Sequence, residues 1–500
     1  MDAYLKIQSV QGGEFTSSQN LVDFVIPQGH TLDLNDTFIQ LNGNIDVTES
    51  TGVGGVGVYN VGLQWVTASA TAKPKFPNVA VIKNANLDCA RKGRIENIRR
   101  VDILRSNLDT YTDTQKEAKC HSYKDASQLA TPINNQQIGL FSQMNKVGSV
   151  RSAQPSSVPI MVRLSDVFEF ARVQEYDTSR AGQTRIHLEL NRDKLEAIQY
   201  GKDASVIAGL KSFKNVTTEV VGNEITIGRQ DQATDTATIF PSLDDSPYYV
   251  GQKLLISAVG AGTGPPGSPT DVAVVISEII WDKNALGGTI TLKFASNWGA
   301  LLTAGQSYTN ITAKISDATA VTYRMNSAEL VVRKVDNPSG LDQINYNTYS
   351  TEETNGNSHT NFQDLYTIEP EASNIFVMFP DGQDGLVSNN NDIASWRLRL
   401  NNIDLTDRDV SKDSPLAYDR LSMTLNSAGM SLANLTKNAG NTLSTGWGNM
   451  YTDADLTSQL VANPLFQTAN TKLLQLNINA GGGGVKKLAL FKQLPRIFAY

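Results

Sequence analysis

Cysteine and histidine are scarce in this chain of 500 residues, which holds two cysteines and four histidines. Two cysteines cannot cross-link a chain of this length, so its stability has to come from buried cores. We expect free thiols at Cys89 and Cys120, with a bridge between them as the alternative. No two histidines stand at metal-ligand spacing, and Cys120 and His121 beside Cys89 would hold zinc only with a fourth ligand from elsewhere. We therefore predict no metal site.

Long apolar runs and an excess of positive charge are also missing. No run approaches the ~18 apolar residues that span a bilayer, and the start, MDAYLKIQ, lacks the basic and apolar regions of a signal peptide. We expect the mature chain to begin there and to fold in a reducing compartment. Forty-three basic and 50 acidic residues give a net charge of −7, which argues against general nucleic-acid binding.

Motifs that carry catalysis are absent or incomplete. GTGPPG at 262–267 has the glycine spacing of a phosphate loop, but Pro265 and Pro266 lack amide donors and no helical pattern follows. No G-x-S-x-G motif is present. PDGQDGLVSNNND at 380–392 lacks the spacing of an EF-hand, so we predict a loop, with adventitious calcium as the alternative. We predict no catalytic or cofactor-binding residues and no cofactor, and hence no enzyme.

One basic cluster interrupts this acidic chain, at ARKGRIENIRR (90–100) and Arg105. Such a cluster can contact a polyanion, but it carries no interleaved aromatic residues for base stacking. We favour the interpretation that its arginines pair with carboxylates of a neighbouring segment. His187 is interpreted in the same way, as a solvated or interface residue on the polar face of a strand.

The chain does contain segments in which apolar and polar residues alternate. Between 38 and 47, the residues at odd positions are Ile39, Leu41, Gly43, Ile45 and Val47, and polar residues stand between them. This period of two is typical of a strand with one buried face. Val22, Phe24 and Ile26 alternate in the same way before Pro27 and Gly29.

The same pattern continues to the end of the chain. It predicts strands at 158–170, 185–191, 323–335, 373–380, 395–405, 472–480 and 486–500. Helical patterns are few and short, at 114–129, 192–199 and 455–466. Many strands joined by polar connections indicate an all-β protein built of sandwiches or barrels.

Composition changes mark three boundaries, near 200–215, 313–322 and 336–343. Between the first two, 272–281 and 289–294 predict a hairpin with a Gly-Gly turn. We interpret 205–318 as an insertion with its own β structure.

The C-terminal segment KKLALFKQLPRIFAY is too apolar for an exposed tail. Because Pro495 lacks an N–H group, we expect it to interrupt the strand and the last five residues to leave the sheet. Two possibilities stay open, that the tail covers its own domain or that it contacts a neighbouring subunit. The glycines at 481–484 predict a turn before this last strand.

Several segments together resemble double jelly-roll major capsid proteins, as found in polinton-like viruses, virophages and adintoviruses within the wider adenovirus-hexon lineage. They are 21–45 with its DLNDTF step at 33–38, 95–111, 162–191 and 326–335, and more weakly 395–405 and 472–500. The resemblance implies an all-β fold of two consecutive eight-stranded jelly rolls with few short helices. The first would comprise 1–204 completed by 319–336, the second 337–500, and 205–318 would be an inserted tower.

The same resemblance implies a structural function. The chain would be the major capsid protein of an icosahedral double-stranded DNA virus, a homotrimer forming a pseudo-hexameric capsomer. Its partners would be neighbouring capsomers and minor capsid or penton proteins, with weak interior contact with genome or membrane. It would be assembled inside the host cell and reside in the virion shell.

Two other classes compete with this function. A carbohydrate-binding or adhesive fibre protein would display aromatic residues on one face, for which Trp281 and Trp298 are the best candidates. A cupin-like enzyme would need clustered histidines, which the sequence lacks.

Overall fold

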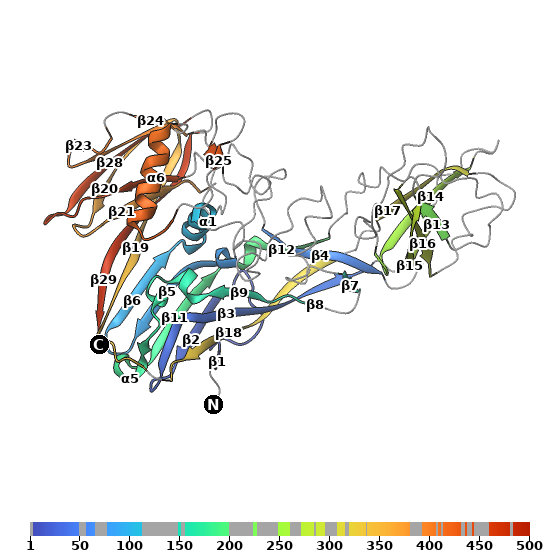
Figure 1. The fold of residues 1–500 in the computed structure, drawn as a ribbon, viewed down its shortest axis with the longest axis horizontal. Helices are drawn as coiled ribbons and strands as arrows, with labels where there is room; N and C mark the ends of the chain where they lie inside the picture. Colours follow the sequence, from blue (N-terminus) through green and yellow to red (C-terminus); the bar gives the residue numbers. More distant parts are fainter. Residues whose placement is uncertain are drawn as a thin grey trace.

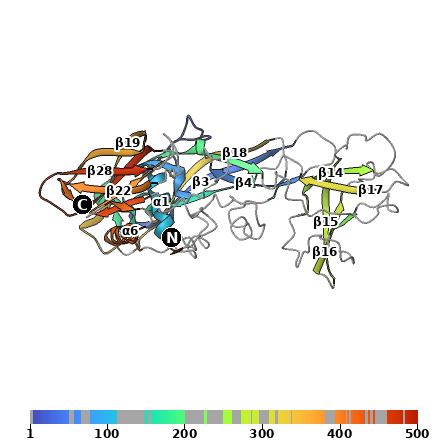
Figure 2. The same cartoon turned by 90° about the horizontal axis from the view of Figure 1, so that it is seen from above.

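The computed structural model describes much of the chain. The described residues are 4–49, 57–65, 78–112, 149–151, 156–199, 224–227, 249–260, 272–284, 287–295, 308–315, 320–336, 338–380, 393–406, 409–411, 414–431, 436–437, 443–444, 460–480 and 484–500. They form two β sandwiches side by side and a separate sheet at the far end of the long axis (Figures 1 and 2).

The first sandwich consists of two antiparallel sheets. In one, the order is β1 (Tyr4–Gln8), β18 (Ala320–Lys334), β3 (Thr31–Thr48) and β10 (Tyr176–Asp177), and β8 (Ser156–Ser157) and β9 (Ile160–Arg163) also pair with β3. In the other, the order is β2 (Leu21–Ile26), β11 (Thr184–Leu190), β5 (Ile82–Cys89) and β6 (Gly93–Arg99).

The second sandwich repeats this arrangement. One sheet has the order β19 (Gln343–His359), β29 (Val485–Ala499), β21 (Asn374–Met378) and β27 (Leu460–Pro464). The other has the order β20 (Asn361–Ile368), β28 (Lys472–Ala480), β22 (Ile393–Leu400) and β23 (Ile403–Asp404), with β24 (Val410–Ser411) also paired to β22.

Strand order identifies the topology of both sandwiches. When the eight main strands of each are counted along the chain, the first pairs with the eighth, the second with the seventh, the third with the sixth and the fourth with the fifth. A long hairpin rolled up into two sheets gives this nested pairing, which is that of a jelly roll. The predicted fold class, two consecutive jelly rolls with few short helices, is confirmed.

Smaller elements connect and cover the sandwiches. The helices are α1 (Val101–Thr112), α4 (Leu164–Val167), α5 (Thr178–Ala181) and α6 (Pro415–Ser427), with 3-10 turns η1 (Asn78–Val81), η2 (Phe170–Arg172) and η3 (Arg192–Lys194). One small sheet has the order β12 (Leu195–Gln199), β4 (Val58–Trp65) and β7 (Ser149–Arg151). In another, β25 (Thr436–Lys437) pairs with β26 (Leu443–Ser444).

The separate sheet has five strands. Their order is β13 (Glu224–Ile227), β16 (Gly287–Phe294), β15 (Val272–Asn284), β14 (Lys253–Gly260) and β17 (Tyr308–Ile315). β15 and β16 form the predicted hairpin, but Gly287 pairs with Asn284, so both glycines belong to β16 rather than to the turn. The sheet is tied to the first sandwich by the ion pair of Lys253 and Glu49 (Nζ–Oε1 2.5 Å).

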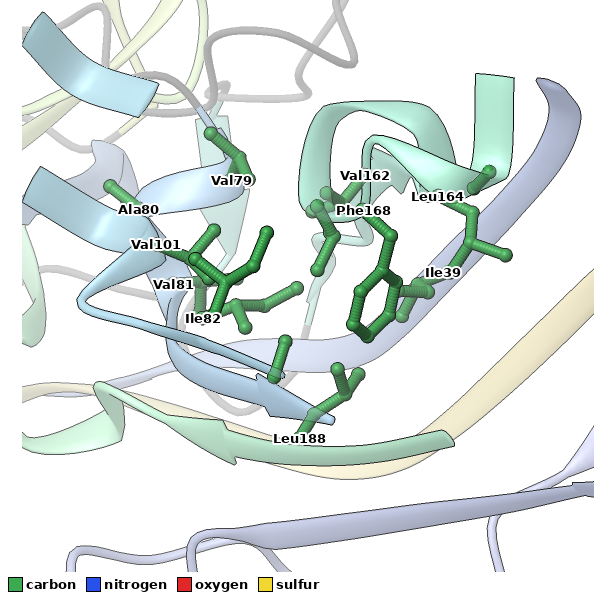
Figure 3. Close-up of a cluster of buried hydrophobic side chains, with 14 of the residues drawn as sticks. Ile39, Val79, Ala80, Val81, Ile82, Val101, Val162, Leu164, Phe168 and Leu188 are labelled. Carbon is green, nitrogen blue, oxygen red and sulfur yellow. The ribbon is translucent and has the colours of Figure 1, made fainter. Parts of the chain in front are cut away.

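The period of two in β2 and β3 is confirmed. Phe24, Ile39 and Ile45 are fully buried, and the residues between the apolar positions of β3 are half-exposed or exposed. Gly43 on β3 has a specific role, because the ring of Tyr323 lies where its side chain would be. Figure 3 shows Ile39, Phe168 and Leu188 meeting in the core of the first sandwich.

Three predicted elements are wrong in part. The helix predicted at 192–199 is η3 followed by β12, which pairs with β4, because strand pairing outweighs the weak helical preference of so short a segment. Within the helix predicted at 455–466, residues 460–464 form β27, which pairs with β21. The strand predicted at 158–170 ends at Arg163, where α4 begins.

The prediction for the C-terminal tail is also wrong. β29 stays paired with β19 without a register shift from Lys487 to Ala499, so the last residues do not leave the sheet. The Ser373 N–H donates to the Gln493 carbonyl (3.0 Å), so the backbone of Gln493 points away from β19. The backbone nitrogen of Pro495, two residues further along the strand, points to the same side as the backbone of Gln493 and lies beyond the end of β21. Its missing N–H therefore removes no bond of the β19–β29 ladder.

The two sandwiches share a core. Phe376, Met378 and Phe491 belong to the apolar cluster of the first sandwich, whereas their strand neighbours Val377 and Leu490 belong to that of the second. The sheet that contains β21 and β29 is therefore buried on both faces, which explains the continuous apolar run at 488–491 of β29.

Candidate functional site

Arg100 holds the end of the first sandwich to the second. Its buried guanidinium pairs with Asp102 at the start of α1 (Nε–Oδ1 3.1 Å) and with Glu353 on β19 (Nη1–Oε1 3.0 Å). Lys487 on β29 also pairs with Glu353 (3.0 Å). Partial burial opposes ionisation of Glu353, but the hydrogen bond from Lys487 and the charge of Arg100 lower its pKa. The chain thus places opposite charges on facing elements of the junction.

Glu96, fully buried on β6, lies in the same junction. Its carboxyl accepts the backbone N–H groups of Phe170 (2.9 Å) and Glu169 (3.3 Å). Burial, with the nearby charge of Glu169, raises the pKa of Glu96 to about 8, against the effect of the Phe170 N–H, the Thr348 hydroxyl and Arg105. Glu96 is therefore mostly protonated at neutral pH.

Glu169 is the acidic side chain that the arginines of this group contact. Arg105 on α1 pairs with it at 2.7 Å and Arg172 on η2 at 2.9 Å. Both arginines thus pair with Glu169, whereas the Glu96 carboxyl accepts backbone N–H groups. Tyr349 on β19 lies near Glu169 and Arg105, and burial raises the pKa of its hydroxyl.

Aromatic rings extend the junction towards the C-terminus. Phe170 makes edge contacts with Tyr346 and Phe498, at centroid distances of 5.1 and 5.4 Å. The Asp177 N–H donates to the Tyr500 hydroxyl (2.8 Å), and Phe498 packs against that ring (5.2 Å). The end of the second sandwich is therefore anchored on the first sandwich of the same chain. A contact of the tail with a neighbouring subunit stays a prediction.

The junction's chemistry is that of a permanent contact. Its charged side chains are held in ion pairs, Glu96 is hydrogen-bonded, and aromatic rings fill the space beside them. Within the described ranges, no group of three or more His, Cys, Asp and Glu side chains is placed to hold a metal ion. These residues are suited to joining two sandwiches rather than to binding a substrate.

The basic cluster behaves largely as interpreted. Arg100 and Arg105 are buried in ion pairs with carboxylates of other segments. Arg94 is exposed and lies 3.8 Å from Asp88, and Arg91 and Lys92 are exposed at the turn between β5 and β6.

The other residues singled out in the sequence do not converge. Cys89 is a buried free thiol, as expected, and Trp281 is half-buried on β15. His187, on the polar face of β11, contacts Asp23 (Nδ1–Oδ1 2.6 Å) and lies 3.8 Å from Asp88. Cys120, His121, Trp298, the 262–267 motif and residues 381–392 of the possible calcium loop lie outside the described residues.

Sequence reasoning missed the helices at the junction. α1 and α6 occupy the same place in the two jelly rolls, between the fifth and sixth strands. α6 carried a recognisable start signal, since Ser414 caps it by accepting the Ala417 N–H and Pro415 is its first residue. In the part of the chain that the structure describes, no helix is long and apolar enough to cross a membrane.

Comparison with known proteins gives structural neighbours alone. No protein-family model and no curated protein matches the chain. Among solved structures, the chain is similar to one from the Sputnik virophage (TM-score 0.39, 11% identity, covering 99% of this chain and 85% of that one). It is also similar to the mavirus major capsid protein (TM-score 0.35, 8% identity, covering 99% of this chain and 87% of that one). A structure from Sulfolobus Turreted Icosahedral Virus is similar as well (TM-score 0.34, 7% identity, covering 98% of this chain and 90% of that one).

Proposed function

We propose that the chain is the major capsid protein of an icosahedral double-stranded DNA virus. The observation that carries the proposal is the same rolled strand order found twice in one chain, with both rolls joined through a shared core. Jelly rolls are frequent in viral capsid proteins. The sequence resemblance to double jelly-roll capsid proteins points the same way.

A structural rather than catalytic role is supported by the junction. Its buried charges and rings join the two sandwiches, and among the described residues no group of three or more His, Cys, Asp and Glu side chains is placed to hold a metal ion. The carbohydrate-binding alternative has no specific observation in its favour.

The proposed division into domains follows the sheets. Residues 1–204 with 319–336 would form the first jelly roll, 205–318 the inserted tower and 337–500 the second jelly roll. The position of β18 supports the first unit, because it pairs with β1 on one side and β3 on the other. The separate five-stranded sheet supports the second.

In this proposal the working unit is a homotrimer in the virion shell. Its partners are neighbouring capsomers and minor capsid or penton proteins, with weak interior contact with genome or membrane. An obligate interface of this kind buries roughly 2,000–5,000 Å².

Size-exclusion chromatography with light scattering tests the proposal. We expect a stable species of three times the chain mass of 54.3 kDa, which electron microscopy of concentrated protein would show assembling into sheets or shells. A monomer that binds glycans on an array would contradict it and favour the adhesive alternative.

A further inference from the structure

The short connections of both jelly rolls gather at one end. Because successive strands run in opposite directions, the connections after the second, fourth and sixth strands lie at the same end of each sandwich. All of them are short; they are 27–30, 90–92, 178–183, 369–373, 401–402 and 465–471. The insertion 205–318 leaves the first sandwich at the other end, after the seventh strand. We call the end with the short connections the base.

The bases of the two sandwiches adjoin. Arg180 on α5 of the first sandwich pairs with Asp342, which directly precedes β19 of the second (Nη2–Oδ1 3.0 Å). The Arg91 N–H donates to the Ala181 carbonyl (3.2 Å), which joins the β5–β6 turn to this contact. Figure 1 shows α5 and the C-terminus together at the end of the molecule away from the five-stranded sheet. The two bases therefore form one surface, on the opposite side from the insertion.

Large apolar side chains project from this base. Phe466, on the connection between β27 and β28, is 75% exposed, and Ile403, beside the β22–β23 turn, is 70% exposed. Leu473, whose N–H donates to the Asn401 side chain in that turn (2.8 Å), is 47% exposed. Exposed apolar side chains of this size mark contacts with proteins or membranes. Because these stand on separate connections at one end, they can enter a lipid surface together.

The charges of the base favour an anionic surface. The carboxylates of Asp342, Glu371 and Asp404 are all held in ion pairs with arginines. Arg91 and Lys92 are exposed at the β5–β6 turn, and among the described residues no carboxylate forms an ion pair with either. The unpaired charges of this turn are therefore positive, which is the sign that attracts anionic lipid headgroups.

We propose that the base docks on a lipid membrane that contains anionic phospholipids. Phe466 and Ile403 enter the boundary between headgroups and acyl chains, and Arg91 and Lys92 contact lipid phosphates. The contact rests on the proposed capsid function, in which the insertion points outward and the base faces the interior of the shell. Packaged DNA would use the two cations but not the apolar side chains, since phosphate contacts dominate its binding.

Vesicle flotation of the full-length protein tests this contact. We expect the protein to float with vesicles of phosphatidylcholine mixed with phosphatidylglycerol, and several-fold less with phosphatidylcholine alone. Ile403→Ser and Phe466→Ser should each lower the bound fraction several-fold, because each removes an inserted apolar side chain. Leu21→Ser is the matched control, since Leu21 is 57% exposed but begins β2, at the other end of the first sandwich. Equal losses in all three variants, or wild-type protein that binds neither vesicle, would overturn the proposal.

A second set of variants tests the cations. Arg91→Gln/Lys92→Gln should lose several-fold of the binding to mixed vesicles and keep its binding to phosphatidylcholine alone. Arg324→Gln is the control, because Arg324 is also exposed but lies on β18 towards the insertion. Wild-type protein that retains duplex DNA through Arg91 and Lys92 and ignores vesicles would assign these cations to the genome and contradict the membrane contact.

Light scattering distinguishes a membrane from a second copy of the chain as the partner of the apolar side chains. We expect Ile403→Ser and Phe466→Ser to keep the mass of wild-type protein. A change of mass in these variants, together with wild-type protein that does not float, would place Ile403 and Phe466 in a contact between copies and refute the proposal.

This contact and the proposed trimer fail separately. A chain that trimerises but binds neither vesicle keeps the proposed function and loses the membrane contact. A monomeric chain that floats with mixed vesicles keeps the contact and loses the trimer.

Discussion

At the scale of single residues, the junction depends on side chains whose burial the sequence pattern did not reveal. Ile95 and Glu96 are adjacent on β6 yet both buried, because the β5–β6 ladder shifts register beside Leu87. A bulge of this kind places two successive residues opposite one. The period of two was a good guide to Ile39 and Phe24, where the ladder is regular, but it could not place Glu96.

Glu96 makes the stability of the junction depend on pH. Its pKa is about 8 in the folded chain and near 4.5 in the unfolded chain. The folded state therefore holds a proton that the unfolded state has lost, and the free energy of unfolding falls as pH rises from about 4.5 to 8. Glu96→Gln keeps a neutral side chain, so we expect its stability to fall less over this range than that of wild type.

Urea unfolding at pH 6 and 8.5 would measure the effect. The difference between the two proteins should amount to a few kcal/mol at most, since one pKa unit corresponds to about 1.4 kcal/mol. The pKa of Glu96 also depends on the groups around it, which are Glu169, Arg105, Arg172, Tyr349 and Thr348. Parallel pH profiles for Glu96→Gln and wild type would show that Glu96 is ionised in the folded chain.

At the scale of elements, strands were easier to predict than helices. β28 coincides with its predicted range, and β18 and β29 nearly do. β18 and β28 alternate along their lengths, whereas β29 was indicated by its many apolar residues. The segments 192–199 and 460–464 were mistaken for helix because short apolar runs fit both periods, and pairing with β4 and β21 decided between them. The β19–β6 contact could not be predicted, because nothing local in either strand indicates its neighbour.

The end of β29 offers a prediction at this scale. Phe498 is buried against rings of the first sandwich, whereas its neighbour Ile497 is 68% exposed. We expect Phe498→Ala to lower the free energy of unfolding by about 3–5 kcal/mol. Ile497→Ala, the matched control, should change it by about 0.5 kcal/mol or less.

Denaturant unfolding with light scattering separates the two roles of the tail. An Ile497→Ala variant that is stable but no longer trimeric would show that the tail contacts a neighbouring subunit. A Phe498→Ala variant as stable as wild type would show that the ring cluster does not hold the sandwiches together.

At the scale of the whole molecule, the five-stranded sheet stands apart from both cores. The Lys253–Glu49 ion pair ties it to the first sandwich, and Glu49 also accepts the Tyr59 hydroxyl (2.6 Å), a bond that would remain without the insertion. Composition changes and the hairpin pattern predicted the insertion, but its sheet order could not be predicted because long-range pairing, such as β13 with β16, leaves no local signal.

We predict that 205–318 is dispensable for folding and trimerisation. Replacing it with a short Gly-Ser linker should leave a soluble trimer, since loop entropy grows only as about (3/2)RT ln n. A longer deletion, 195–318, is the control and should be destabilised, because it also removes β12, which pairs with β4 and packs against β18. Circular dichroism and light scattering would measure both, and aggregation of the shorter deletion would show that the insertion belongs to the core.

The position of β18 has a consequence for synthesis on the ribosome. This strand fills the gap between β1 and β3, and Tyr4 pairs with Arg333. While the insertion is being translated, the nascent first sandwich has seven of its eight strands and an open gap in one sheet. At about 5–20 residues per second this interval lasts on the order of ten seconds or more. A chaperone that shields β1 and β3 during that time should raise the yield of folded protein more than one that acts after release.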